Sequence, residues 1–293
     1  MAARGSLVPI GSDTKLVGLI GDPVDHSRSP AMHNAAFRAL GLPWAYLAFP
    51  VPGDRVGEAV AAVRALGLVG LNVTIPHKQA VIPHLDKLSR RALACGAVNT
   101  IVHRRGVLRG ENTDVIGLER DWGELGVAPR VKDAVVLGAG GSARAAAVAL
   151  ASRSRRVLVA ARRVEKARAL VGDLRRTLRT KIEAVDLADL RPDSNSAHGW
   201  LEHAGLVVNS TSAGMKGEPF FPFAFGATPK SCFFYDLIYT ARRTPFVTAA
   251  ARVRRPGANG LGMLLHQGAA AFEIWTGVEP PLDVMRRALA RKP

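Results

Sequence analysis

Apolar and polar residues alternate along the chain with two different periods, and these periods predict strands and helices in regular succession. In the first third, short apolar runs typical of strands alternate with amphipathic helical segments, and two more helices end the chain. Strands are expected at 16–20, 46–49, 71–75, 100–103 and 107–110, and helices at 30–40, 54–66, 78–93 (broken at Pro83), 115–125, 261–275 and 282–290. This alternation predicts an α/β fold whose first sheet is mainly parallel.

A glycine-rich turn interrupts the alternation in the middle of the chain. The apolar run 135–137 leads into Gly138, and Gly140 and Ala143 follow at the spacing of a dinucleotide-binding turn, with a helical segment directly after them. Gly138 would permit the tight turn, Gly140 would let the backbone approach a pyrophosphate, and Ala143 would let helix and strand pack closely. The free N–H groups at the start of that helix would bind phosphate oxygens.

The rest of the pattern suggests how the chain divides into domains. Further strands are expected at 157–160, 182–185, 206–209 and 233–238, a polar surface loop at 191–199, and a flexible lead over 1–14. We therefore expect two α/β domains with a cleft between them, the second of Rossmann type. The expected boundaries are 15–113 plus 265–293 for the first domain and 114–264 for the second.

The residues after the strand at 157–160 indicate which nicotinamide dinucleotide would bind. In NAD-preferring folds an acidic residue here accepts a hydrogen bond from the ribose 2′-hydroxyl, but this chain has Ala161, Arg162 and Arg163. Two guanidinium groups suit a 2′-phosphate, because arginine makes planar bidentate contacts to phosphate oxygens. The pattern favours NADP over NAD, and the alternative is two solvated arginines.

Composition narrows the classes of partner. The net charge of +16 and the pI near 10.9 would permit binding to nucleic acid, to an anionic membrane or to anionic metabolites. The arginines are scattered and aromatic residues make up only 6% of the chain, so stacking on nucleic-acid bases is not expected. No apolar run approaches the roughly 18 residues of a spanning helix, and Cys95 and Cys232 lie at no metal-ligand spacing. We expect a cytoplasmic protein with reduced thiols and no metal, membrane or nucleic-acid partner.

Two serines before the first helix are candidate ligand-binding residues. Ser27 and Ser29 lie two residues apart, so both hydroxyl groups point to one side if the backbone is extended. Ser29 precedes Pro30 and a helical segment, so it could instead be only the N-cap of that helix. Ser27 has no such structural explanation.

The strand at 71–75 carries polar residues on one side only. Asn72 and Thr74 share one face, Val73 and Ile75 share the other, and the next turn places Lys78 just beyond the carboxyl end of the strand. Ligands bind in crevices outside the carboxyl ends of strands in α/β sheets. A partly desolvated lysine there can exchange protons, although a surface lysine is the plainer interpretation.

Amide and carboxylate side chains also lie in two loops expected near the same edge. Asn99 lies just before the strand at 100–103, and Asp114 lies just after Asn112 and Thr113. Asp114 could be only the N-cap of the helix at 115–125. Beside Lys78, its carboxylate would hold the ammonium group and accept a hydrogen bond from a substrate hydroxyl.

Seven ordered motifs together resemble the shikimate dehydrogenase family over nearly the whole chain. They are Gly-Asp-Pro-Val-Asp-His-Ser-Arg-Ser-Pro at 21–30, Asn-Val-Thr-Ile-Pro-His-Lys at 72–78, Ala-Val-Asn-Thr at 97–100, Asn-Thr-Asp at 112–114, Asn-Ser-Thr-Ser-Ala-Gly-Met at 209–215, Tyr-Asp-Leu-Ile-Tyr at 235–239 and Asn-Gly-Leu-Gly-Met-Leu at 259–264. Where the family commonly has Asn-Arg-Thr, this chain has Ala161-Arg162-Arg163, so its side-chain contacts at 161 and 163 must differ.

The resemblance implies roles for individual residues. Lys78 and Asp114 match the catalytic pair. The residues that match substrate contacts are Ser27, Ser29, Asn72, Thr74, Asn99, Asp114, Tyr239 and Gln267. Those that match cofactor contacts are Gly138, Ala139, Gly140, Gly141, Ser142, Ala161, Arg162, Arg163, Lys166, Leu237 and Gly260.

The resemblance also implies an activity. It is the reversible, NADPH-dependent reduction of 3-dehydroshikimate to shikimate, a step toward chorismate and the aromatic amino acids, carried out by a monomer or homodimer. The alternatives are a quinate/shikimate dehydrogenase of mixed specificity and a non-catalytic NADP-binding protein. A nucleic-acid binder is a further alternative that the charge of +16 suggests.

Overall fold

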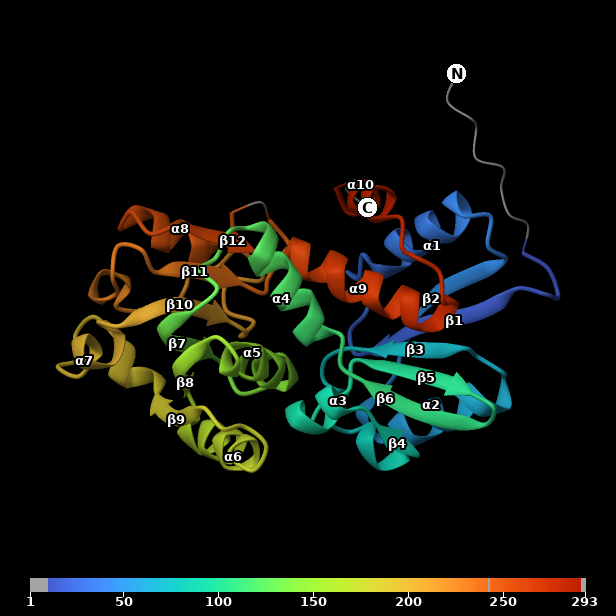
Figure 1. Cartoon of the computed structure of the whole chain (residues 1–293), viewed down its shortest axis with the longest axis horizontal. Helices are drawn as coiled ribbons and strands as arrows, with labels where there is room; N and C mark the ends of the chain where they lie inside the picture. The colour runs from blue at the N-terminus through green and yellow to red at the C-terminus, as the bar shows by residue number, and fades with distance from the viewer. Residues whose placement is uncertain (1–9, 242, 291–293) are drawn as a thin grey trace, which may run out of the picture. The chain divides into compact units, whose positions relative to one another are not determined.

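The computed structural model describes residues 10–241 and 243–290, which form two compact units (Figure 1). The first unit consists of the described residues up to Leu93, Ala97–Gly117 and those from Leu265 onward. The second consists of Ala94–Gly96 and Leu118–Leu264. Of the flexible lead expected over 1–14, residues 1–9 lie outside the described part of the chain. Residues 291–293 of the first predicted domain also lie outside it.

A six-stranded sheet of order β2-β1-β3-β5-β6-β4 forms the centre of the first unit. Its strands are β1 (Lys15–Gly21), β2 (Trp44–Pro50), β3 (Gly70–Val73), β4 (Lys87–Leu88), β5 (Thr100–Arg104) and β6 (Val107–Glu111). β1 pairs in parallel with β2 and β3, and β4 pairs in parallel with β6. β5 pairs antiparallel with β3 and with β6. Three of the five pairings are parallel, so the expected mainly parallel sheet is confirmed, and the strands expected at 100–103 and 107–110 form an antiparallel hairpin.

Helices bury the apolar side chains of the first sheet. The helices are α1 (Ser29–Ala39), α2 (Val56–Ala65), α3 (Arg90–Cys95), α9 (Leu261–Thr276) and α10 (Leu282–Ala290). Val60 and Val63 of α2 pack with Leu71 of β3 in one apolar cluster. Aromatic rings of α1, β2 and α9 form another group, in which Phe37 and Phe272 lie 5.2 Å apart between ring centroids. Each such fully buried side chain contributes about 1.5–3 kcal/mol to folding.

The second unit is built on a parallel sheet of order β12-β11-β10-β7-β8-β9. Its strands are β7 (Val131–Leu137), β8 (Ser154–Ala161), β9 (Lys181–Asp186), β10 (Ala204–Asn209), β11 (Phe233–Asp236) and β12 (Gly257–Asn259). The helices around it include α5 (Gly141–Ala151), α6 (Val164–Leu174), α7 (Ala197–Leu201) and α8 (Pro245–Arg252), and α4 (Asp114–Glu124) precedes β7. The strand order reverses between β7 and β10, which is where doubly wound sheets bind dinucleotides. The predicted α/β class is confirmed.

Several predicted elements differ from the observed ones. The helix expected at 78–93 is instead a 3₁₀ turn at Ile82–His84, the short strand β4 and the helix α3. Pro83 has no N–H to donate, which prevents a continuous helix. The strand expected to reach residue 75 ends at Val73, although the Ile75 backbone oxygen still accepts a hydrogen bond from the Asp22 N–H at 3.0 Å, and the Ile75 side chain is 59% exposed. The polar stretch 191–199 is a loop only up to the start of α7.

Across residues 10–241 and 243–290, no helix combines sufficient length with sufficient apolar character to span a membrane.

Candidate functional site

Ser27 and Ser29 lie where β1 leads into α1. The backbone N–H of Ser29 donates a hydrogen bond to Ser27 Oγ at 3.3 Å, so the two residues form one turn. Ser29 is the first residue of α1 and is 6% exposed, while Arg28 holds the N-cap position and no side chain caps the helix. The interpretation of Ser29 as the N-cap is therefore wrong. The Arg28 guanidinium donates to the backbone oxygen of Leu289 at 3.0 Å, which ties this turn to α10.

Asn72 lies on β3 and is almost completely buried. Its Nδ2 donates to the backbone oxygen of Asn99 at 3.2 Å and to Thr100 Oγ1 at 3.0 Å. Its Oδ1 accepts a hydrogen bond from the Tyr46 hydroxyl at 2.8 Å. Both amide hydrogens are thus directed at protein acceptors, so a ligand could only donate to Oδ1. Thr74 follows the end of the strand and is half-buried.

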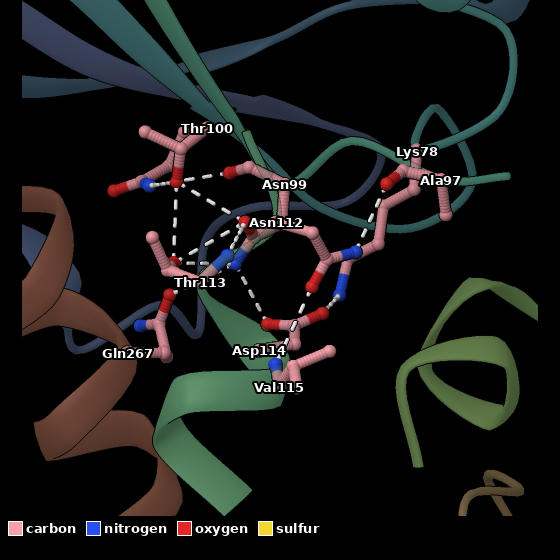
Figure 2. Close-up of polar contacts among 10 residues, drawn as sticks. Lys78, Ala97, Asn99, Thr100, Asn112, Thr113, Asp114, Val115 and Gln267 are labelled. Atoms are coloured by element: carbon pink, nitrogen blue, oxygen red, sulfur yellow. Dashed lines mark hydrogen bonds and ion pairs between the residues drawn. The ribbon is translucent and has the colours of Figure 1, made fainter. Parts of the chain in front are cut away.

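Lys78 and Asp114 form a buried ion pair (Figure 2). The Lys78 Nζ lies 2.6 Å from Asp114 Oδ2, and the side chains are only 11% and 4% exposed. The backbone N–H of Val98 donates to the backbone oxygen of Lys78 at 2.7 Å, which fixes the turn that carries the lysine. Breaking a buried pair of this kind by removing one partner typically costs about 3–5 kcal/mol of stability.

Asn99 lies between this ion pair and α9. Its Nδ2 donates to Asp114 Oδ1 at 2.7 Å and, at 3.3 Å, to Gln267 Oε1. Its Oδ1 accepts from the backbone N–H of Thr113 at 2.7 Å. The structure therefore brings Lys78, Asp114, Asn99 and Gln267 together, as Figure 2 shows.

The first turn of α4 positions Asp114 without being capped by it. The Asp114 carboxylate points at Lys78 and Asn99, and the backbone N–H of Val115 donates instead to Asn112 Oδ1 at 3.4 Å. The Nδ2 of Asn112 donates to the backbone oxygen of Ala97 at 2.9 Å, which joins this loop to the one that carries Asn99. Asp114 is therefore not the N-cap that its position in the sequence suggested, and its side chain is committed to the ion pair.

The glycine turn after β7 has the features expected of a phosphate-binding turn. Gly138 has φ +115°, and an added Cβ would lie 2.6 Å from Ser210 Oγ, so glycine is required there. An added Cβ at Gly140 would meet no protein atom within 4 Å, so any need for glycine at that position would come from a ligand. Ala143 is fully buried in α5.

A cavity of about 600 Å³ opens at the carboxyl ends of β7, β8 and β10. Six residues expected to bind the cofactor line it: Gly138, Ala139, Ala161, Arg162, Arg163 and Lys166. Eight further residues line the cavity, and the sequence analysis had not predicted a role for any of them individually: Leu187, Ser210, Thr211, Ser212, Ala213, Glu218, Pro219 and Phe221. Four of these eight belong to the motif at 209–215, and their place directly after a buried strand was the signal for them. Gly140, Gly141, Ser142, Leu237 and Gly260 are not among the residues that line the cavity.

The charges around this cavity fit a phosphorylated dinucleotide. Arg162, Arg163 and Lys166 supply three cationic groups. The one carboxylate in the lining, Glu218, accepts backbone hydrogen bonds from Gly214 at 2.9 Å and Lys216 at 3.0 Å. Backbone hydrogen bonds, including these, lower the pKa of Glu218. The carboxylate thus stabilises its own loop, and the cations remain in excess.

Leu237 and Gly260 lie close together in the second unit. An added Cβ at Gly260 would come within 2.7 Å of the Leu237 backbone oxygen, so these segments can approach only with glycine at 260. Asp236 Oδ1 accepts from the backbone N–H of Ile238 at 3.1 Å and fixes the turn that presents Leu237. Burial raises the pKa of Asp236 to about 6. Tyr239 follows this turn and is half-buried.

Two family models match the chain. Residues 19–101 match the shikimate dehydrogenase substrate binding domain, and residues 260–290 match the shikimate 5′-dehydrogenase C-terminal domain. A curated relative from Geobacter sp. (strain M21), named shikimate dehydrogenase (NADP(+)), is 43% identical over 285 residues. That alignment covers 97% of this chain and 97% of the relative.

The chain is also similar to solved structures, which include a shikimate dehydrogenase and a quinate dehydrogenase. Shikimate 5-dehydrogenase from Thermus thermophilus, in complex with NADP(H) and shikimate, has a TM-score of 0.81 at 33% identity. The match covers 94% of this chain and 98% of the other. Quinate dehydrogenase from Corynebacterium glutamicum, in complex with NAD, has a TM-score of 0.83 at 33% identity, with the same coverage of 94% and 98%.

Proposed function

The chain belongs to the shikimate dehydrogenase family, and from that premise we propose that it catalyses the reversible, NADPH-dependent reduction of 3-dehydroshikimate to shikimate. The observation that carries this proposal is the buried pair of Lys78 and Asp114, at 2.6 Å, with Asn99 donating to the same carboxylate. A purely structural pair buried at strand ends would be a costly arrangement, because both charges lose their hydration. A catalytic role for Lys78 and Asp114 would explain why the fold maintains this costly pair.

The proposed chemistry assigns a separate task to each group. NADPH, when bound, supplies the hydride that adds to the carbonyl carbon C3 of the substrate. Lys78 donates a proton from Nζ to the C3 oxygen during reduction and accepts it back during oxidation. Asp114 orients the ammonium group through Oδ2, and Asn99 fixes the carboxylate through Oδ1. The ketone thus gains one hydride and one proton and becomes the secondary alcohol.

Other polar residues of the first unit are proposed to hold the substrate. Ser27 and Ser29 bind the carboxylate of the substrate by hydroxyl hydrogen bonds. Asn72, Thr74 and Gln267 add further contacts, with Asn72 acting as an acceptor because both of its amide hydrogens are used within the protein. The first unit is then the substrate-binding domain. Tyr239, which belongs to the second unit, is proposed as one more substrate contact.

The second unit is proposed to be the NADP-binding domain. The turn from Gly138 to Ser142 would hold the pyrophosphate at the start of α5, and Ala161 to Lys166 would hold the adenosine ribose and its 2′-phosphate. Arg162 and Arg163 line the cavity and are exposed, so their guanidinium groups could donate to phosphate oxygens. Leu237 and Gly260 would lie near the nicotinamide.

A quinate/shikimate dehydrogenase of mixed specificity is the second candidate. It is favoured by one observation, the 33% identity to a quinate dehydrogenase with a TM-score of 0.83. That relative was solved with NAD, whereas this chain has two arginines and no acid at 161–163. We therefore keep shikimate and NADP as the proposed pair.

The cellular setting is also a proposal. Small molecules are the proposed partners, with the chain working in the cytoplasm as a monomer or homodimer and without nucleic acid. The two cysteines, Cys95 and Cys232, are both buried and are not joined in a disulfide, as expected for reduced thiols in that compartment. Size-exclusion chromatography with light scattering would establish the oligomeric state.

A steady-state assay tests the proposal directly. The absorbance of the reduced nicotinamide is followed with four pairs: shikimate or quinate with NADP or NAD. The proposal expects the highest kcat/KM for shikimate with NADP. A higher value for quinate with NAD would favour the second candidate, and no turnover with any pair would favour a non-catalytic NADP-binding protein.

A further inference from the structure

We propose that Tyr46 is a positioning residue that acts on the Lys78–Asp114 pair through a directed chain of buried hydrogen bonds. The inference rests on the proposed function, since it concerns the same ion pair. Tyr46 lies on β2 and is fully buried, and it belongs to none of the sequence motifs that define the site.

The first link of the chain is fixed by a backbone carbonyl. Asn72 Nδ2 lies 3.2 Å from the backbone oxygen of Asn99, which can only accept, so the nitrogen of the amide must be on that side. The amide oxygen Oδ1 therefore faces Tyr46. Since Oδ1 has no hydrogen, the Tyr46 hydroxyl is the donor in their 2.8 Å hydrogen bond.

The next links carry the same direction across the sheet. Asn72 Nδ2 also donates to Thr100 Oγ1 at 3.0 Å, which leaves the Thr100 hydroxyl proton for a second partner. That partner is Asn99 Oδ1 at 3.1 Å, or Thr113 Oγ1 at 3.2 Å, and Thr113 Oγ1 in turn donates to Asn99 Oδ1. Both routes end on the amide oxygen of Asn99.

A second backbone group fixes the last amide. The backbone N–H of Thr113 donates to Asn99 Oδ1 at 2.7 Å, so Asn99 Nδ2 must be the group that faces Asp114 Oδ1, at 2.7 Å. One continuous series of donors thus runs from Tyr46 through Asn72, Thr100 and Asn99 to the Asp114 carboxylate. Asn99 Nδ2 also lies within hydrogen-bond distance of Thr113 Oγ1, at 2.9 Å, and of Gln267 Oε1, at 3.3 Å. The two backbone groups fix the orientation of both amides, and the Thr100 hydroxyl is the donor in its bond to Asn99 Oδ1 because that oxygen has no hydrogen.

A chain of this kind is cooperative. An amide that accepts at its oxygen becomes a stronger donor at its nitrogen, and each bond in the series gains about 10–30% in strength. The side chains that form this series of hydrogen bonds are shielded from water: Tyr46 and Thr100 are 0% exposed, and Asn72, Asn99 and Asp114 are 3–4% exposed. The Tyr46 hydroxyl therefore strengthens the hydrogen bond that Asn99 donates to Asp114 Oδ1, and this bond holds the carboxylate in place against the Lys78 ammonium group.

Tyr46 is itself held in place by the ring of His33. The two rings are parallel, with centroids 4.4 Å apart and planes inclined by 1°. Complete burial lowers the pKa of His33 to about 3, so the imidazole stays neutral at ordinary pH and adds no charge to the chain. The titratable groups that this chain of hydrogen bonds meets are thus His33 at its start and the Lys78–Asp114 pair at its end.

The test removes two different links of the hydrogen-bond chain by substitution and compares these variants with a matched control. Tyr46→Phe removes only the first donor and keeps the stacked ring, and Thr100→Val cuts nearer to Asp114. Trp275→Phe is the control, because it removes a buried donor of the same core, whose bond to the Ile101 backbone oxygen measures 3.0 Å. The Trp275 ring packs 6.2 Å from the Tyr46 ring between centroids, so this variant tests the effect of packing changes around Tyr46 without removing a hydrogen bond of the series. Thermal unfolding of all variants identifies any that are not folded.

Two readouts are needed. The first follows the carboxyl carbon of Asp114 by ¹³C NMR against pH in aspartate-labelled protein, with the signal assigned from Asp114→Asn. The second is the pH profile of kcat with shikimate and NADP. In Tyr46→Phe, the acidic limb of the profile should move to higher pH, and the carboxyl signal should change with it. In Thr100→Val the shift should be larger, and in Trp275→Phe both curves should coincide with wild type.

The outcomes separate this inference from the function on which it rests. Coincident titrations for folded Tyr46→Phe and wild type would overturn the inference, and so would an equal shift in Trp275→Phe, which would indicate general loosening of the core. If the variants show the carboxyl shifts but the wild-type protein shows no turnover, the chain of hydrogen bonds is established and the proposed activity is overturned instead.

Discussion

The ammonium nitrogen of Lys78 lies 2.6 Å from a carboxylate oxygen of Asp114, although the residues are 36 positions apart in the sequence. Lys78 comes from the turn after β3 and Asp114 from the first residue of α4, so the geometry depends on two loops being held together. Both are joined to the loop at 97–99: Asn112 donates to the Ala97 backbone oxygen at 2.9 Å, and the Val98 N–H donates to the Lys78 backbone oxygen at 2.7 Å. The pair is thus set by the fold before any ligand arrives, which is the pre-organisation that proton transfer requires.

Replacing Lys78 with alanine should reduce kcat strongly. Loss of a positioned acid–base group costs on the order of a hundred- to ten-thousand-fold in rate. The KM for shikimate should barely change, because the serines and amides that hold the substrate remain. Lys87→Ala, at an exposed lysine of the same unit, is the control and should keep wild-type kcat. A folded Lys78→Ala enzyme that retained a third of wild-type kcat would contradict the assignment.

Changing Arg162 to aspartate and Arg163 to alanine together should weaken NADP binding. Each charge-assisted hydrogen bond to the 2′-phosphate contributes roughly 1.5–3 kcal/mol, so the KM for NADP should rise at least tenfold while that for NAD is little affected. Arg168→Ala removes an exposed arginine of α6 that does not line the cavity and should leave both values unchanged. Unchanged NADP affinity in the double variant would mean that these arginines are only solvated surface groups.

The fold could be predicted from the sequence to a large extent, because its strongest signals are local. The apolar run before Gly138 and the small residues after it specify a strand, a turn and a helix within a few positions, and the structure contains all three. The stretch 78–93 was predicted as a helix broken at Pro83, but only its end, from Arg90, is α-helix, and the strand β4 was not predicted. The pairing of β4 with β6, at Lys87 and Leu88, depends on residues about twenty positions away.

The candidate site could be predicted only in part. Lys78 and Asp114 stand out as polar groups at element ends, but Tyr46, Thr100 and Thr113 look like ordinary strand or loop residues. Their importance comes from hydrogen bonds between separate strands, such as Tyr46 to Asn72, which join positions 26 residues apart. Sequence periodicity contains no information on such partners. The roles of the individual site residues stay predictions until they are tested by mutation.

Replacing His33 with phenylalanine should make the protein less sensitive to acid. Burial lowers the pKa of His33 from 6.5 to about 3, so the unfolded chain binds a proton below pH 6.5 that the native state does not. Stability therefore falls as the pH decreases from 6.5 toward 3, by up to about 1.4 kcal/mol per pH unit from this group. Phenylalanine also removes two buried ring nitrogens that have no hydrogen-bond partner among the described residues.

Urea unfolding at pH 7 and pH 5 measures this effect. The free energy of unfolding of His33→Phe should decrease less between the two pH values than that of wild type. His203→Phe, at a histidine that is half-exposed on the second unit, serves as the control and should keep the wild-type difference. An identical decrease in wild type and His33→Phe would show that His33 takes up its proton in the folded state.

The enzyme should prefer shikimate to quinate by a wide margin in kcat/KM. Quinate carries an added tertiary hydroxyl on the carbon that bears the carboxylate, and it lacks the ring double bond. Ser27 and Ser29 belong to one turn, joined by the 3.3 Å bond from the Ser29 N–H to Ser27 Oγ, and this turn is tied to α10 through Arg28. A turn fixed at both ends cannot easily make room for the added hydroxyl, and an unpaired buried hydroxyl costs about 1–3 kcal/mol. That cost corresponds to roughly ten- to a hundred-fold in kcat/KM. Arg28→Met should loosen the turn and narrow the preference, whereas equal kcat/KM for both acids in the wild-type enzyme would support the mixed-specificity alternative.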